Sequence, residues 1–150
     1  MKFTCTTEIN APMDKVVALF DNPDNLRHWQ QGYVSTELIR GKTGEVGAQS
    51  KITLNFRGRP MILIETLRVR DLPYEIKALY EHEHMINTAT HRFYPLDGRH
   101  TKYETEVHYT QFIGIMPKLM ALLMPGMFRK QTQLTVERFK AFAEKAHKAV

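Results

Sequence analysis

The chain has 150 residues, a formal net charge of +5 at pH 7 and a hydrophobic content of 43%. This length suits a single domain spanning residues 1–150, and the composition excludes a disordered or collagen-like chain. The only cysteine, Cys5, cannot form an internal disulfide, so we expect a reducing compartment or simple burial of a small side chain.

The basic residues are scattered along the chain in short pairs such as Arg57 and Arg59. No segment combines dense positive charge with interleaved aromatic residues, so we expect no nucleic-acid partner. No basic segment precedes an apolar one at the N-terminus, which argues against a signal peptide and favours a cytoplasmic location.

The first thirty residues predict a strand followed by two short helices. Residues 2–10 alternate between apolar and polar side chains, which is the period of a half-buried strand. Pro12 suits the start of a first helix, and Pro23 suits the start of a second one that Gly32 ends.

The middle of the chain predicts six strands joined by short turns. Short connections join antiparallel neighbours, so these strands form a meander. The expected strands are residues 33–41, 48–58, 59–73, 74–84, 87–95 and 101–112.

From residue 114 onward the apolar side chains recur at helical spacing. Pro125 and Gly126 divide this region into a short apolar helix and a long C-terminal one. Two prolines, two glycines and Lys118 argue against a membrane-spanning helix. The flexible methionines here suit an adaptable wall beside a ligand or simple core filling: Met116, Met120, Met124 and Met127.

Three segments resemble the START/polyketide-cyclase (SRPBCC) superfamily, whose members share the helix-grip fold of birch-pollen-allergen-like proteins. They are INAPMDKVVALFDNPDNLRHWQ (residues 9–30), PLDGRHTKYETEVHY (residues 95–109) and the two apolar segments of the C-terminal region. The resemblance implies an α+β fold in which a curved antiparallel sheet of about seven strands wraps around a long C-terminal helix. It also implies a cavity that holds apolar or amphipathic molecules in carriers and in aromatase/cyclase enzymes.

Residues 81–93 contain three histidines and two glutamates. Alternation places His82 and His84 on the face of Ile76 and Ala78, which we expect to point inward. A turn centred on Ile86 would then direct His91 to the opposite face, so we expect no three-histidine metal site.

Glu65 is predicted to share the inward face with Met61, Leu63, Leu67 and Val69. A carboxyl group in apolar surroundings has a raised pKa and can act as an acid or a base. The alternatives are a position near the strand end or pairing with an arginine such as Arg57. Arg92, placed inward by the same register, would bind an acidic head group or pair with a glutamate.

Three functions stay open at this point. The first is binding of a lipid-like, polyketide-like or aromatic molecule, without a cofactor or metal. The second is a polyketide cyclase/dehydratase-like enzyme with His82, Glu65 and Tyr103 as acid–base groups. The third is a lipid handler that contacts membrane surfaces transiently; the oligomeric state is not predicted. The expected ligand-binding residues are Trp29, Ile52, Leu54, Phe56, Glu65, Tyr80, His82, His84, Tyr103, Met120, Met127 and Phe139.

Overall fold

The computed structural model describes residues 1–149, and its elements follow the predicted order. The strands are β1 (Lys2–Ile9), β2 (Tyr33–Arg40), β3 (Gln49–Phe56), β4 (Arg59–Asp71), β5 (Glu75–His82), β6 (Met85–Asp97) and β7 (His100–Phe112). The helices are α1 (Met13–Asp21), a short 3-10 helix η1 (Pro23–Asn25), α2 (Leu26–Trp29), α3 (Ile115–Leu123) and α4 (Pro125–Lys148).

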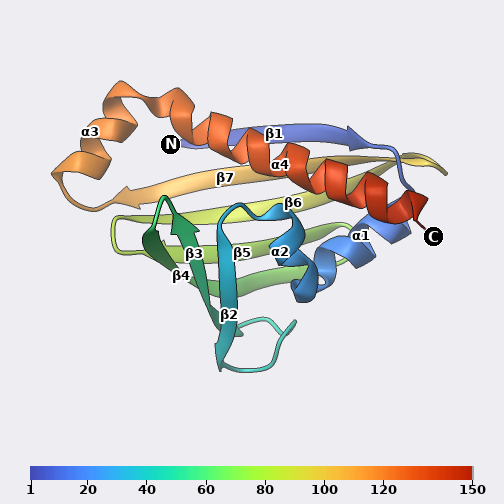
Figure 1. Cartoon of the computed structure of the whole chain (residues 1–150), viewed down its shortest axis with the longest axis horizontal. Coiled ribbons are helices and arrows are strands. Elements are labelled where there is room, and N and C mark those ends of the chain that lie inside the picture. The colour runs from blue at the N-terminus through green and yellow to red at the C-terminus, as the bar shows by residue number, and fades with distance from the viewer. Residues whose placement is uncertain (150) are drawn as a thin grey trace.

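All seven strands form one antiparallel sheet in the order β1-β7-β6-β5-β4-β3-β2. β2 and β3 stand nearly upright in Figure 1 whereas β7 runs almost horizontally, so the sheet is strongly twisted and curved. α4 crosses its concave side along β1, with α1 and α2 beside the C-terminal half of α4 (Figure 1). This is the predicted helix-grip fold.

Local chemistry explains how the chain enters the sheet after α2. Gly32 has a φ of +74°, and a side chain there would place its Cβ 2.3 Å from the carbonyl oxygen of Asn55. The absence of a Cβ lets the backbone N–H of Asn55 donate to the carbonyl oxygen of Gly32 over 2.7 Å. This contact fixes the start of β2 beside the end of β3.

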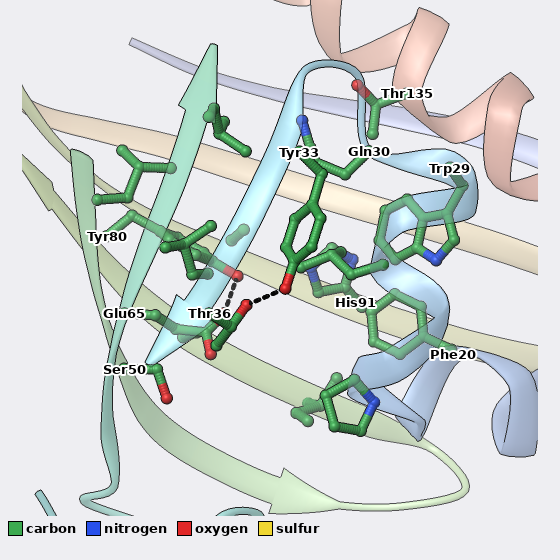
Figure 2. Close-up of a pocket in the computed structure, with 18 of the residues that line it drawn as sticks. Phe20, Trp29, Gln30, Tyr33, Thr36, Ser50, Glu65, Tyr80, His91 and Thr135 are labelled. Atoms are coloured by element: carbon green, nitrogen blue, oxygen red, sulfur yellow. Dashed lines mark hydrogen bonds between the residues drawn. The ribbon is translucent and has the colours of Figure 1, made fainter. Parts of the chain in front are cut away.

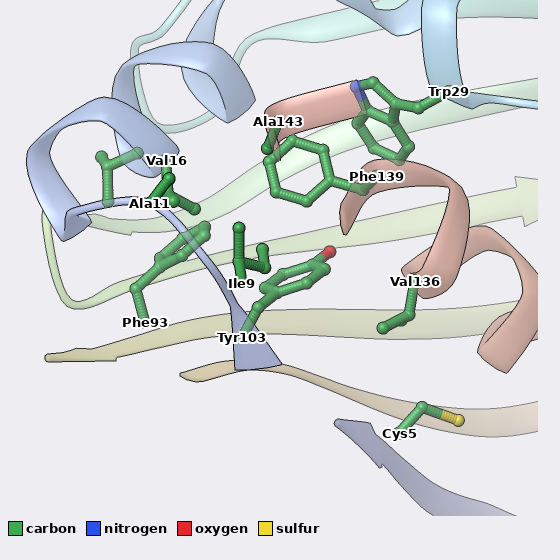
Figure 3. Close-up of a cluster of buried hydrophobic side chains, with 11 residues drawn as sticks. Cys5, Ile9, Ala11, Val16, Trp29, Phe93, Tyr103, Val136, Phe139 and Ala143 are labelled. Carbon is green, nitrogen blue, oxygen red and sulfur yellow. The ribbon is translucent and has the colours of Figure 1, made fainter. Parts of the chain in front are cut away.

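The hydrophobic core lies where α4 meets β1, β7 and α1 (Figure 3). Val136, Phe139 and Ala143 are spaced by three and four residues, so they share the buried face of α4. The Phe139 ring packs 5.2 Å from the ring of Trp29 and 5.1 Å from that of Tyr103, measured between centroids. Aromatic packing therefore fills one end of the space between the sheet and α4.

α3 ends at Leu123 and α4 begins at Pro125, which confirms the predicted division of the helical region. Within residues 1–149, no helix has the length and apolar character needed to cross a membrane.

Candidate functional site

The other end of the space between the sheet and the helices is an open cavity of about 800 Å³. The concave face of the sheet forms its floor, and α2 and the first half of α4 contribute to its walls. α4 presents Gln131, Thr132 and Thr135 to it together with the apolar Val136. Seven of the residues expected from the sequence line this cavity: Trp29, Ile52, Leu54, Phe56, Glu65, Tyr80 and Tyr103.

The other five expected residues lie outside the residues that line this cavity. Phe139 belongs to the packed core instead, and Met120 and Met127 sit in the region of α3 and the start of α4. His82 ends β5 and His84 lies in the following turn, where the backbone N–H of His84 donates to Nδ1 of His82 over 3.1 Å.

The predicted outward direction of His91 was wrong because the turn between β5 and β6 lies earlier than expected. His82 pairs with Met85, so the turn contains only Glu83 and His84. His91 consequently pairs with Ile76 and points inward, where it lines the cavity. Among the described residues, no group of three metal-ligating side chains is arranged to hold a metal ion.

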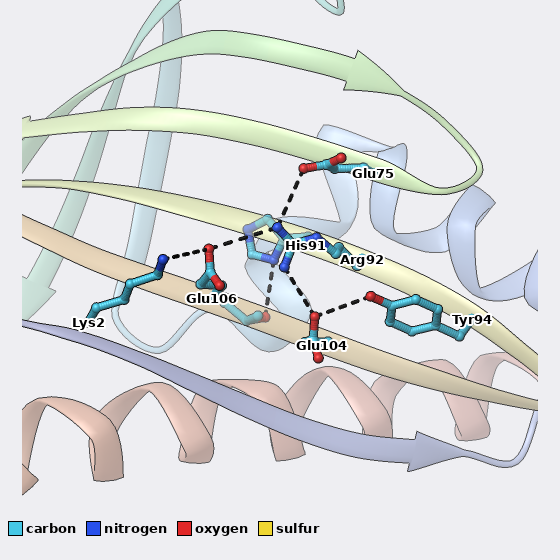
Figure 4. Close-up of polar contacts among 8 residues, drawn as sticks. Lys2, Glu75, His91, Arg92, Tyr94, Glu104 and Glu106 are labelled. Atoms are coloured by element: carbon cyan, nitrogen blue, oxygen red, sulfur yellow. Dashed lines mark hydrogen bonds and ion pairs between the residues drawn. The ribbon is translucent and has the colours of Figure 1, made fainter.

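The same register places Arg92 on the convex face of the sheet, which corrects its predicted inward position. Its guanidinium lies 3.2 Å from the Glu104 carboxylate, 3.7 Å from that of Glu75 and 3.8 Å from that of Glu106 (Figure 4). Arg92 therefore neutralises outer glutamates and is unable to bind a head group in the cavity.

His91 forms one of two hydrogen-bonded groups inside the cavity. Its Nδ1 lies 2.8 Å from the Tyr103 hydroxyl and 3.2 Å from the Thr105 hydroxyl. Removal from bulk water lowers the pKa of His91 to about 4 and raises the pKa of Tyr103. At neutral pH this group is therefore an uncharged imidazole beside an uncharged phenol.

Glu65 and Tyr80 form the second group (Figure 2). They pair directly across β4 and β5, and the Tyr80 hydroxyl donates to Oε2 of Glu65 over 2.8 Å. Burial raises the pKa of the Glu65 carboxyl despite this hydrogen bond, and burial beside Glu65 raises that of Tyr80. Glu65 thus lines the cavity as predicted, with a tyrosine rather than Arg57 as its partner.

Arg70 and Asp21 lie on the cavity wall and were not found from the sequence. A β-bulge between Leu67 and Val69 reverses the alternation in β4, so Val69 is exposed and Arg70 turns toward the cavity. Two Arg70 nitrogens donate to the two Asp21 oxygens over 2.7 and 2.8 Å. This bidentate pair joins β4 to the end of α1.

One signal in the sequence would have identified His91. Ala89 and Phe93 flank it at two-residue spacing and are both buried, so the apolar alternation of β6 already marks its face. The bulge in β4 has no such marker.

Chemically, the cavity combines apolar walls with uncharged hydroxyl groups, one imidazole and one buried carboxyl group. The Tyr33 and Thr36 hydroxyls lie 2.6 Å apart on the β2 side (Figure 2). Such a site can hold an apolar body, orient it by a few hydrogen bonds and exchange protons with it.

Comparisons with known proteins agree with this architecture. The family described as "Polyketide cyclase / dehydrase and lipid transport" matches residues 1–144. A search of curated protein sequences finds no match.

Solved structures share the fold at low sequence identity. The Zhui aromatase/cyclase from Streptomyces sp. R1128 has 10% identity and a TM-score of 0.79, over 97% of this chain and 94% of that one. Norcoclaurine synthase from Thalictrum flavum, solved with dopamine and hydroxybenzaldehyde, has 13% identity and a TM-score of 0.69, over 97% and 87%. A START superfamily protein from Mycobacterium smegmatis has 10% identity and a TM-score of 0.70, over 94% and 98%.

At these identities the structural likenesses show the fold alone, whereas the family match extends over nearly the whole chain. The chain therefore belongs to the polyketide cyclase/dehydrase and lipid transport family.

Proposed function

We propose that the protein binds a small hydrophobic or amphipathic molecule in the cavity between the sheet and α4. The observation that carries this proposal is the cavity of about 800 Å³, which falls within the range of volumes that small-molecule sites occupy. Apolar residues such as Ile52 and Leu54 would bury the ligand's body, and the two hydrogen-bonded groups would orient it.

Titration with the neutral dye Nile red tests this proposal. Trp29 is the only tryptophan and lines the cavity, so a dye bound there quenches its fluorescence. We expect saturable quenching together with a blue shift of the dye emission. A dye that leaves Trp29 fluorescence unchanged at saturating concentration would argue against a site in this cavity.

A second candidate function is acid–base catalysis of the polyketide cyclase/dehydratase kind. The observation that favours it is that the pair formed by His91 and Tyr103 and the pair formed by Glu65 and Tyr80 line one cavity. A neutral imidazole can accept a proton from a carbon between two carbonyl groups, and a carboxyl group with a raised pKa can return one to the new alkoxide. His91 takes the role that the sequence assigned to His82.

An assay that measures cyclisation of a linear poly-carbonyl substrate by the absorbance of the product distinguishes a catalytic function from a binding function. An enzyme loses turnover in the His91→Ala and Glu65→Gln variants and keeps it in His108→Ala, which replaces an exposed histidine. Turnover that is absent in the wild type, or equal in all these proteins, would leave binding as the function.

We further propose that α3 makes transient contact with membrane surfaces. Apart from Lys118 its side chains are apolar, and most are exposed, with Ile115 84%, Leu122 76% and Leu123 67% accessible. Figure 1 shows α3 protruding at the end of the molecule where β7 ends, far from the C-terminus. Exposed apolar surface of this kind marks a contact site.

The charges around α3 favour an anionic lipid surface as the partner. No aspartate or glutamate occurs between Glu106 and Glu137, whereas Lys118, Arg129 and Lys130 in this interval are exposed. Apolar side chains beside basic ones are the combination that interfacial helices use on anionic membranes.

Co-sedimentation with vesicles tests this contact. We expect binding to vesicles that contain phosphatidylglycerol, weaker binding to pure phosphatidylcholine, and loss of binding when Leu122 and Leu123 are both replaced by glutamate. Val46→Glu is the matched control because Val46 is 63% exposed in the connection between β2 and β3. Equal binding by both variants would exclude α3 as the contact.

A further inference from the structure

A polar row crosses the floor of the cavity at right angles to the strands. Ser50 on β3 pairs with Glu65 on β4, Glu65 pairs with Tyr80 on β5, and Tyr80 pairs with Asn87 on β6. All four residues line the cavity. Because directly paired residues share one face of a sheet, the row presents its polar groups side by side to a bound molecule.

The row carries one acidic group and no basic one. None of the ion pairs formed within residues 1–149 involves Glu65, and its Oε1 receives no hydrogen bond from the described residues. Oε1 is also absent from the fully enclosed unpaired polar atoms, so it stays accessible from the cavity. Glu65 therefore offers a free acceptor in partly desolvated surroundings.

The cations on the cavity wall lie elsewhere, on α2 and near the end of β4. Arg70 forms the bidentate pair with Asp21 at the end of α1. Arg27 belongs to α2, is exposed, and donates from Nε to the carbonyl oxygen of Asp24. Neither of these arginines belongs to the row on the floor.

An anionic head group placed on this floor would lose its water without gaining a cation. A hydroxyl group in the same place would donate to Oε1 of Glu65. The net charge of +5 attracts anions to the molecule as a whole. The cavity floor, in contrast, disfavours anions and favours uncharged hydroxyl groups.

Building on the proposed ligand binding, we infer that the cavity selects uncharged amphiphiles whose hydroxyl group, an alcohol or a phenol, donates to Glu65, and that it rejects carboxylates and phosphates. Glu65 is then the residue that determines the specificity of the cavity.

Displacement of Nile red by dodecanol and by dodecanoate, which have equal chain length, tests the inference at neutral pH and submicellar concentration. We expect dodecanol to displace the dye at least about tenfold more effectively, since burying a carboxylate without a counter-ion costs more than the roughly 1.4 kcal/mol that corresponds to a tenfold change in affinity. The Glu65→Gln variant should narrow this preference by binding dodecanoate more tightly.

Glu81→Gln is the matched control, because it makes the same substitution on the exposed face of β5. It should keep the wild-type preference. If the wild type binds Nile red and dodecanoate displaces it as well as dodecanol does, the inference is overturned while ligand binding stands. If Nile red does not bind at all, the proposed function fails and the inference fails with it. The wild-type comparison decides even if Glu65→Gln does not fold.

Discussion

Ala89→Leu is the substitution that best separates an open cavity from a packed interior. Ala89 lies on β6 at the cavity floor, between Asn87 and His91 on the same face, and is 7% exposed. Leucine adds three carbons, and burying each contributes about 0.8 kcal/mol, so full burial would stabilise the fold by at most about 2.4 kcal/mol. Lost rotamer freedom of leucine offsets about 0.5–1 kcal/mol of this.

We therefore expect Ala89→Leu to leave the free energy of unfolding unchanged or to raise it by about 1–2 kcal/mol. Binding should weaken by about tenfold or more, because the ligand then meets the overpacking cost of about 1–3 kcal/mol. Urea unfolding followed by circular dichroism measures the stability, and Nile red titration measures the binding.

Ala143→Leu is the control for this experiment, since Ala143 is fully enclosed in the core on α4. The same added carbons have no free space there, so this variant should lose about 1–3 kcal/mol of stability. An open cavity beside Ala89 is refuted if Ala89→Leu destabilises the fold as much as Ala143→Leu does, or if the Ala89→Leu variant binds Nile red like the wild type.

Two other predictions concern the core and the buried imidazole. Phe139→Ala should lower the free energy of unfolding by about 3–5 kcal/mol because its ring is fully buried. Phe142→Ala, on the half-buried side of α4, should lower it by less in the same urea experiment. Equal losses in the two variants would contradict the role of Phe139 in holding α4. The pKa of His91 falls from 6.5 in the unfolded chain to about 4 in the fold, so the unfolded state takes up the proton first and stability is lost as pH falls from 6.5 toward 4. His91 accounts for about 3 kcal/mol of that loss. In urea experiments across this pH range, the free energy of unfolding of His91→Gln should therefore decrease by correspondingly less than that of the wild type. An identical decrease would mean that the His91 ring is hydrated in the fold.

Much of the architecture was predictable because each element has a local signal. Pro12 and Pro23 mark helix starts, the two-residue alternation marks the strands, and Pro125 marks the division between α3 and α4. The meander followed from the short turns, which restrict neighbouring strands to antiparallel pairing.

The site was less predictable because a side chain's direction depends on register, which a single residue can reverse. The turn at Glu83 and His84 contains no glycine or asparagine to mark it, so the predicted turn fell too late and His91 was assigned to the wrong face. The bulge in β4, which turns Arg70 toward the cavity, is likewise not marked by any residue type in the sequence. Glu65 was placed inward because it precedes that bulge.

The sequence also does not indicate that α3 lies outside the cavity. Flexible methionines in an apolar helix suit the wall of a ligand cavity, so Met120 and Met127 were predicted to line it. The structure instead leaves many apolar side chains of this region exposed. Only the tertiary arrangement distinguishes a cavity wall from a protruding surface.

Native mass spectrometry of the protein purified without detergent tests the central claim most directly. The cavity should retain a small uncharged hydroxylated molecule, seen as a single added mass that collisional activation removes and that Ala89→Leu diminishes. A spectrum showing only the mass of the bare chain, from protein that also fails to bind Nile red or dodecanol, would contradict the proposal that this cavity holds a ligand.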